Sequence, residues 1–164
     1  MLERWVVNAS PLIVLGKIGQ LELLTKLPQR IVVPAAVVSE IMAGPEGDAA
    51  RIAIQTKMFT KVNTPGNLTP ELAAWDLGAG ETSVLAYSIA HPGWIAVLDD
   101  GAARKCAKSF GIPLKGTLAV IILAKKRGLI PSAAKVLHAV QEAGLRLDEG
   151  LIRVVLHQTV GEDW

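Results

Sequence analysis

The stretch Trp94-Ile95-Ala96-Val97-Leu98-Asp99-Asp100-Gly101 decides the fold class of this chain. Its uninterrupted apolar run, followed by an acidic pair and a glycine, is typical of a short strand that is buried on both faces. Such strands belong mainly to parallel sheets, in which helices connect one strand to the next. We therefore expect an α/β fold, with Asp99 and Asp100 at the carboxyl end of this strand.

The rest of the sequence fits the same alternation of strands and helices. Further strands are predicted at residues 4–7, 31–33 and 112–114, and residues 63–70 are rich in turn formers and are predicted to form a loop. Helices are predicted at 12–18, 21–27, 34–43, 47–57, 81–90, 102–110, 117–127 and 131–143, with a last one capped by Asp148. The pattern indicates a mostly parallel sheet covered by helices on both faces.

The bulk composition limits the class of protein. With 164 residues, of which 51% are hydrophobic, the chain has the size of one domain, and we expect a single domain over 1–164. The longest apolar run, Leu118 to Ala124, is well short of the ~20 residues that cross a membrane, so we expect a cytoplasmic protein without a membrane partner. Cys106 is the only cysteine, which excludes a disulfide framework and a thiolate zinc site.

The net charge of +2 hides an uneven distribution along the chain. Residues 1–100 hold ten Asp and Glu against seven Lys and Arg, whereas residues 101–141 hold eight Lys and Arg and no acid. The second stretch could face a polyanion such as RNA. Ordinary solvated helix faces also carry Lys and Arg, so both interpretations stay open.

Five residues occupy the positions where open α/β sheets bind ligands, just after a strand or early in the following helix. They are Asn8, Glu40, Glu81, Asp99 and Asp100. If the four carboxylates converge, their repulsion requires a compensating charge. Oxygen ligands without paired His or Cys favour Mg²⁺ or Mn²⁺ over zinc, and these metals suit phosphate chemistry. Each acid alone could instead be solvated or could stabilise a helix dipole.

Other polar and aromatic residues carry weaker signals. Arg104, one helical turn after Asp100, could bind a carboxylate or a substrate phosphate. Ser10 is expected to be a helix N-cap rather than a nucleophile, and Thr117 is expected to line the cleft. The histidines His91, His138 and His157 lack ligand spacing, and the tryptophans Trp5, Trp75, Trp94 and Trp164 are expected in the core or at a dimer contact, or stacked on bases where exposed.

A set of segments spread over almost the whole chain resembles a known family, the PIN-domain nucleases, and in particular the short prokaryotic PIN-like proteins. The segments are Val6 to Ile13 with Gly19-Gln20-Leu21, Pro34 to Glu40, Gly78 to Ala86, Leu98 to Arg104, and Gly116-Thr117 with Ala124-Lys125 and Gly128-Leu129-Ile130. The resemblance implies a three-layer α/β/α fold and Mg²⁺- or Mn²⁺-dependent cleavage of RNA that leaves a 5′ phosphate and a 3′ hydroxyl. It also implies a homodimer and, in many members, the toxin role of a toxin-antitoxin pair.

Carried over residue by residue, the resemblance matches Glu40, Glu81 and Asp100 to the second, third and fourth acidic positions, with Asp99 as an adjacent candidate. The first position departs from the pattern, since many members have Asp where this chain has Asn8. Asn8 keeps a carbonyl oxygen for a metal but has no formal charge. The leading hypothesis is an endoribonuclease for single-stranded RNA, with Ser10, Arg104, Lys105, Lys115 and Thr117 as the residues that bind the substrate.

Two other functions remain open from the sequence. Because Asn8 replaces an acid, the chain could be a catalytically silent PIN-like module that binds RNA or protein, with a cognate antitoxin as one possible partner. An apolar patch between residues 10 and 27 could serve a dimer or an antitoxin, although core burial explains it equally well. A doubly wound phosphoacceptor domain fits poorly, since it needs an acceptor Asp after a further central strand and a Lys late in the chain.

Overall fold

The computed structural model describes residues 2–64, 66 and 68–164, and its centre is one parallel sheet. The strands are β1 (Arg4–Val7), β2 (Arg30–Pro34), β3 (Thr60–Val62), β4 (Ile95–Val97) and β5 (Leu114–Lys115), in the spatial order β3-β2-β1-β4-β5. Every neighbouring pair is parallel, so the expected α/β fold with a mostly parallel sheet is confirmed.

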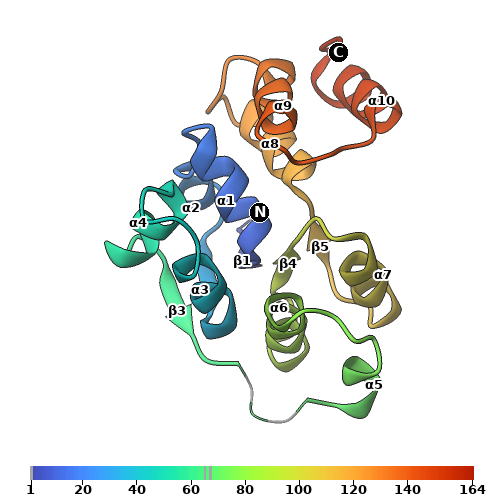
Figure 1. Ribbon diagram of the computed structural model, residues 1–164. Coiled ribbons are helices and arrows are strands. Elements are labelled where there is room, and N and C mark those ends of the chain that lie inside the picture. Colours follow the sequence, from blue (N-terminus) through green and yellow to red (C-terminus); the bar gives the residue numbers. More distant parts are fainter. Residues whose placement is uncertain (1, 65, 67) are drawn as a thin grey trace.

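Helices flank this sheet in a three-layer α/β/α arrangement (Figure 1). They are α1 (Ala9–Lys17), α2 (Leu23–Lys26), α3 (Ala35–Met42), α4 (Ala49–Gln55), α5 (Pro70–Ala73), α6 (Ala79–Ala90), α7 (Gly101–Ser109), α8 (Thr117–Lys126), α9 (Ala133–Glu142) and α10 (Glu149–Val160). Helix α6 packs on β1, β2 and β4 and against α3, while α8, α9 and α10 pack on one another at the top of Figure 1. No helix among the described residues is long and apolar enough to cross a bilayer.

The centre of the sheet is the most deeply buried part of the molecule. In β1, Trp5, Val6 and Val7 have no exposed surface, and Ala96 and Val97 of β4 are equally inaccessible. Strands covered on both faces have no solvent-facing side chain, so their sequences are continuously apolar rather than alternating. The expected burial of Trp5 and Trp94 is confirmed, whereas Trp75 keeps 38% of its surface exposed.

The structure departs from the predicted elements in four places. The sequence did not predict β3 or α5, because Thr60-Lys61-Val62 has no apolar run and α5 is a single turn. The extended segment expected at 112–114 lies at Leu114–Lys115. Residues 65 and 67 of the predicted loop 63–70 lie outside the described residues, and Pro70 already belongs to α5. Ser10 is not an N-cap, because α1 begins at Ala9 and Asn8 holds the N-cap position.

The strand order determines where a ligand can enter. From β1 the chain builds outward to β2 and β3 on one side and to β4 and β5 on the other, so the order reverses between β1 and β4. The backbone of Asn8, directly after β1, donates a hydrogen bond of 3.0 Å to the carbonyl of Val97. In open parallel sheets the crevice outside the carboxyl ends at such a reversal is the usual binding site.

Candidate functional site

A cavity of about 290 Å³ lies outside the carboxyl end of β1. It is lined by Asn8, Ala9, Ser10, Ile13, Val14 and Lys17 from β1 and α1, by Glu40 and Glu81, and by Ala143, Gly144 and Leu145 after α9. Three of the five predicted metal ligands, Asn8, Glu40 and Glu81, therefore come together from distant parts of the sequence. We call these three residues the acid site.

Asn8 is the deepest residue of the acid site, with 2% of its surface exposed. Its backbone is extended at the N-cap of α1, but its side chain does not cap that helix. Instead the Nδ2 group donates a hydrogen bond of 3.4 Å to Oε1 of Glu81. The Oδ1 atom is buried and accepts no hydrogen bond from any described residue. A buried acceptor without a partner costs about 1–3 kcal/mol, so this oxygen is available for a ligand.

Gly80, in the first turn of α6, explains how two oxygens can face the same space. A Cβ atom at this position would lie 3.0 Å from Oε2 of Glu40 and 3.1 Å from Oδ1 of Asn8. Both oxygens therefore border the point that a side chain at Gly80 would fill. The absence of a side chain at Gly80 therefore lets α3, which carries Glu40, and the end of β1, which leads to Asn8, lie this close to α6.

The two acids of the site lie close enough to influence each other. Burial and the negative charge of Glu81 raise the pKa of the Glu40 carboxyl. Glu81 lies in the first turn of α6, where the helix dipole favours a negative charge. A Cβ atom on Gly78 would meet Oε2 of Glu81 at 2.6 Å, so the motif Gly78-Ala79-Gly80-Glu81 provides space for both carboxylates.

Asp99 and Asp100 are not part of this cluster. Asp100 is the N-cap of α7 and accepts a hydrogen bond of 2.9 Å from the amide of Ala103. Asp99 accepts hydrogen bonds from Thr117, at 2.8 Å from the amide and 2.6 Å from the hydroxyl. Thr117 is fully buried and donates its hydroxyl to Asp99 instead of lining the cavity. Within the described part of the chain, no three His, Cys, Asp or Glu residues are grouped so that they could hold a metal.

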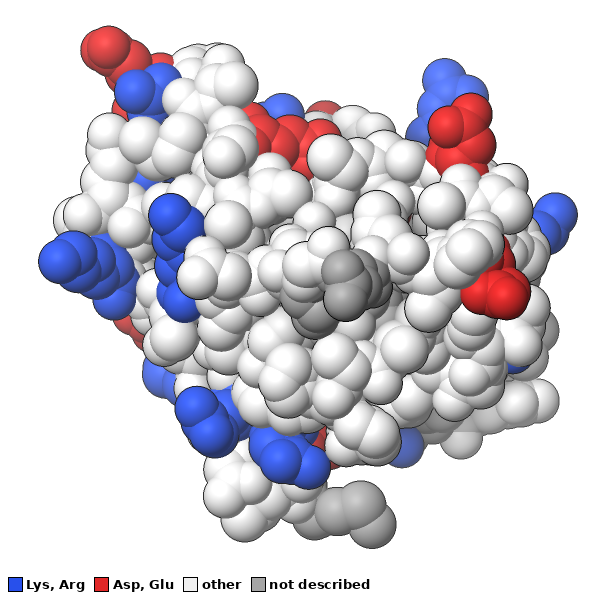
Figure 2. Space-filling model, turned by 90° about the horizontal axis from the view of Figure 1, so that it is seen from below, with Lys and Arg blue, Asp and Glu red and all other residues white. Residues whose placement is uncertain are grey.

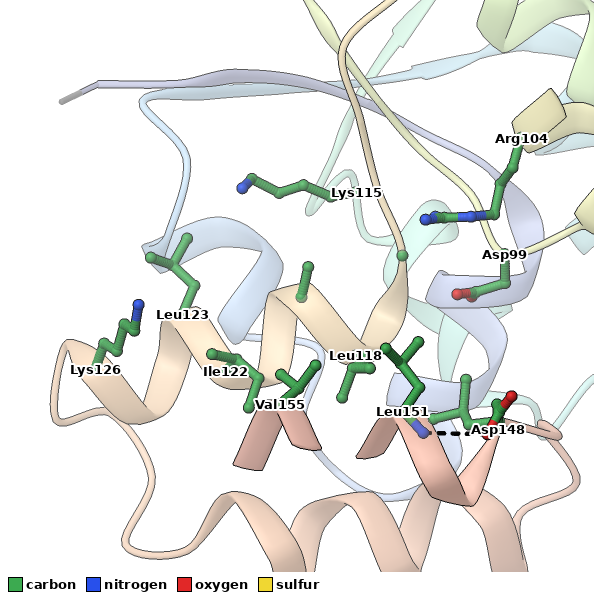
Figure 3. Close-up of a pocket in the computed structure, with 13 residues that line it drawn as sticks. Asp99, Arg104, Lys115, Leu118, Ile122, Leu123, Lys126, Asp148, Leu151 and Val155 are labelled. Atoms are coloured by element: carbon green, nitrogen blue, oxygen red, sulfur yellow. Dashed lines mark hydrogen bonds between the residues drawn. The ribbon is translucent and has the colours of Figure 1, made fainter. Parts of the chain in front are cut away.

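The basic residues predicted to guide RNA are spread over several elements. Arg104 on α7 donates to the carbonyl of Leu98 at 3.2 Å, and Lys115 on β5 lies 3.6 Å from the carboxylate of Glu3. Both line a second cavity, between α8 and α10 (Figure 3). Lys105 is exposed on α7. Figure 2 shows the molecule from below, where Lys and Arg lie around the margin and uncharged residues fill the middle.

The donor atoms of the acid site suit a divalent metal. Its possible donors are the oxygens of Glu40, Glu81 and Asn8, which are the ligand type that Mg²⁺ and Mn²⁺ prefer. The unpartnered Oδ1 of Asn8 fits a cation here, because it lies near the same side of Gly80 as Oε2 of Glu40. The charge of the two carboxylates would be offset by such an ion.

Sequence reasoning missed the role of Gly80 and the residues that close the cavity. Lys17 and the segment 143–145 border the acid site, but only the folded chain brings them there. The closely spaced glycines before Glu81 were a usable signal, since a Gly within the first turn of a helix often marks a close approach.

Comparison with known proteins agrees with this architecture. A family model described as a PIN domain matches residues 4–161, which is nearly the whole chain. The comparison with curated proteins found no match. The predicted resemblance is confirmed, and the chain belongs to the PIN-domain family, whose members are typically nucleases.

Proposed function

We propose that this protein is a metal-dependent endoribonuclease that cuts single-stranded RNA at the acid site. The observation that carries the proposal is the buried, unpartnered Oδ1 of Asn8, which lies close to Gly80 on the same side as Oε2 of Glu40. A nuclease needs oxygen atoms that can hold a cation, because phosphodiester cleavage requires charge compensation next to the scissile phosphate. PIN domains generally use divalent metal ions, which fits this donor set.

Each residue of the acid site has a distinct role in the proposal. Glu40 and Glu81 would hold the ion through their carboxylates, and Asn8 would contribute its carbonyl oxygen. Asn8 also orients Glu81, because its Nδ2 group donates to that carboxylate. When bound there, Mg²⁺ or Mn²⁺ polarises the phosphodiester and stabilises the leaving oxygen. Lys17 lines the same cavity and supplies a positive charge for the RNA backbone.

The test is cleavage of a labelled single-stranded RNA of mixed sequence with Mg²⁺, Mn²⁺ or EDTA. We expect cutting only with metal, and a loss of about 100-fold or more in Glu40→Gln and Glu81→Gln. Glu71→Gln on α5 is the matched control, because Glu71 is exposed and lies outside the cavity. Asp100→Asn tests the role predicted for that residue, since Asn keeps an oxygen for the cap of α7. Equal cutting by wild type and both site variants would exclude the acid site.

A second candidate is a PIN-like module that binds RNA without cutting it. The observation that favours it is the neutral amide of Asn8, which takes the first acidic position and already donates to Glu81. Asn8→Asp separates the two functions. Activity that appears only in this variant would mean that the natural protein is catalytically silent, whereas metal-dependent cutting by wild type would exclude the silent module.

The remaining predicted partners rest on the family resemblance. We propose a homodimer, which a mass measurement in solution tests directly. A toxin role would require a neighbouring antitoxin gene and growth arrest on expression. The RNA contacts that we propose for Ser10 and Lys105 are tested by RNA binding in EDTA, where cleavage cannot interfere.

A further inference from the structure

The second cavity is larger than the cavity that contains the acid site, and its lining is mainly apolar. It has a volume of about 410 Å³ and lies between the packed helices α8 and α10. Its apolar lining comes from Leu118, Ile122, Leu123, Leu147, Leu151 and Val155. We call this cavity the α8–α10 groove, and Figure 3 shows its side chains converging from the two helices.

The apolar surface continues beyond the groove onto the outer side of α10. Leu151 is 52% exposed and Val154, one helical turn further, is 51% exposed. Exposed leucine and valine next to an apolar cavity form an exposed hydrophobic patch, which is typical of an interaction site. A small molecule inside the cavity would leave Val154 uncovered, whereas a helix laid along α10 would cover it.

Positive charges border the groove. Arg104 and Lys115 lie on one margin, and Lys126 lies at the C-terminal end of α8 (Figure 3). The ion pairs found among the described residues include none of Lys126. The cationic margin therefore fits an occupant with acidic side chains.

The two carboxylates of the groove are already committed to helix ends. Asp99 accepts from the amide and hydroxyl of Thr117, the first residue of α8. Asp148 is the N-cap of α10 and accepts from the amide of Leu151 at 3.1 Å. These bonds place the negative charges at helix N-termini, which the helix dipoles offset. Lys115 in turn lies 3.6 Å from the carboxylate of Glu3. Among the described lining residues, Arg104 and Lys126 are therefore the cations left for an acidic partner.

We propose that the α8–α10 groove binds an acidic amphipathic helix of a partner protein. Leucine-like side chains at i, i+3 or i+4 and i+7 of that helix would enter the groove, and its acidic residues would face Arg104 and Lys126. The edge strand that borders the groove, β5, is only two residues long, so it offers little backbone pairing to an extended peptide. This assignment gives Arg104 a protein partner in place of the RNA phosphate predicted from the sequence.

Single-stranded RNA is a poorer match for the groove. Proteins that bind such strands combine positive charge with aromatic side chains on which bases stack. None of the described residues that line the groove is aromatic, and its interior is aliphatic. The proposal is independent of nuclease activity, because the groove and the acid site have no lining residue in common.

The experiment uses a fluorescein-labelled synthetic helix of about five turns, with leucine on one face and glutamate beside it. Its control is the same peptide with every glutamate replaced by lysine. Binding to the full-length protein is followed by fluorescence anisotropy. We expect the acidic peptide to bind at least about tenfold more tightly than the basic one, and Lys126→Glu and Leu151→Asp each to weaken it by about tenfold.

Arg153→Glu is the matched control, because it makes the same change of charge on α10. Residues 151 and 153 are two apart in a helix, so their side chains project in nearly opposite directions. We expect this variant to bind the acidic peptide as wild type does. Circular dichroism melting of each variant separates lost binding from lost folding, and Lys126→Glu alters an exposed side chain that the core does not need.

Several results would overturn the proposal. Equal affinity for the two peptides, no binding of the acidic one, or equal weakening by Arg153→Glu and Lys126→Glu would each exclude an acidic helix in the groove. Displacement of the peptide by mixed-sequence RNA would make the groove a nucleic-acid site. Self-association that Leu151→Asp abolishes, without peptide binding, would make a second copy of this chain the occupant.

Discussion

Gly80 is the single residue that keeps the acid site open. In Gly80→Ala the new Cβ would lie 3.0 Å from Oε2 of Glu40 and 3.1 Å from Oδ1 of Asn8, so these two proposed ligand atoms would have to move apart. Alanine is favourable within a helix by up to about 1 kcal/mol relative to glycine, so we expect a folded protein. We expect Mg²⁺ affinity, measured by calorimetry, to fall at least about tenfold.

Gly47→Ala is the control for this change, because a Cβ at Gly47 meets no atom within 4 Å. It should bind Mg²⁺ as wild type does. An unchanged affinity in Gly80→Ala would mean that the metal does not occupy the space between Glu40 and Asn8.

Asn8 is the residue at which this chain departs most clearly from the family pattern. Asn8→Asp removes the hydrogen bond from Nδ2 to Glu81 and places a third carboxylate beside Glu40 and Glu81. In EDTA we expect the free energy of unfolding to fall by about 1–3 kcal/mol, because Asn8 is buried and the new charge has no partner.

Magnesium should reverse this loss more strongly in Asn8→Asp than in wild type, since an ion that binds only the folded state stabilises it. Denaturant unfolding with EDTA and with Mg²⁺ measures both effects. A variant as stable as wild type in EDTA and indifferent to Mg²⁺ would contradict a cation at Asn8.

At the scale of elements, the C-terminal segment is fastened to the N-terminus of α9. Glu162 accepts from the hydroxyl of Ser132 at 3.0 Å and from the amides of Ala133 at 2.9 Å and Ala134 at 3.0 Å. Burial alone would raise the pKa of Glu162, but the hydrogen bonds from Ala134, Ala133 and Ser132 and the charge of Lys125 outweigh it and lower that pKa. The carboxylate therefore acts as an N-terminal cap supplied from elsewhere in the chain.

Glu162→Gln is expected to lower the free energy of unfolding by about 1–2 kcal/mol at neutral pH. A lowered pKa in the folded state gives stability that is complete above the unfolded-state pKa and is lost as pH falls through the folded-state pKa. The difference in the free energy of unfolding between Glu162→Gln and wild type should therefore disappear at acidic pH. Urea unfolding over a pH series measures it.

Asp163→Asn is the matched control, since this neighbouring carboxylate is 97% exposed and its contact with His157 contributes little. It should not change stability at any pH in the series. A constant difference for Glu162→Gln down to strongly acidic pH would contradict a role for the charge of Glu162.

Helix ends also explain which elements could be predicted. Asp148 was expected to cap the last helix and does so, because a side chain that accepts from the amide three residues later is a local signal. Ser10 was wrong as an N-cap because the helix begins one residue before it, and Asn8 turns toward Glu81 instead of toward α1. A capping signal fails where a tertiary contact competes for the same side chain.

At the scale of the whole molecule, the sequence predicted four of the five strands of the described sheet and a ligand set of which three of five residues line one cavity. The buried run ending at Leu98 and the rule for carboxyl ends were sufficient to bring Asn8, Glu40 and Glu81 together. They were not sufficient for Asp99, which turns to Thr117 eighteen residues away. The close approach of Glu40 and Asn8 to Gly80 and the α8–α10 groove both depend on packing between elements far apart in the sequence. No local sequence pattern encodes such packing.

The separation of the two cavities leads to a last prediction, about their independence. The acid site is built from β1, α3 and α6, and the groove from α8 and α10, with only the connection 143–148 bordering both. Because distant sites without shared partners contribute additively, Mg²⁺ and the acidic peptide should each raise the melting temperature by the same amount with or without the other. Glu40→Gln should lose only the effect of Mg²⁺, and Lys126→Glu should weaken only that of the peptide. A peptide effect that changes with Mg²⁺ would mean that the connection 143–148 couples the groove to the acid site.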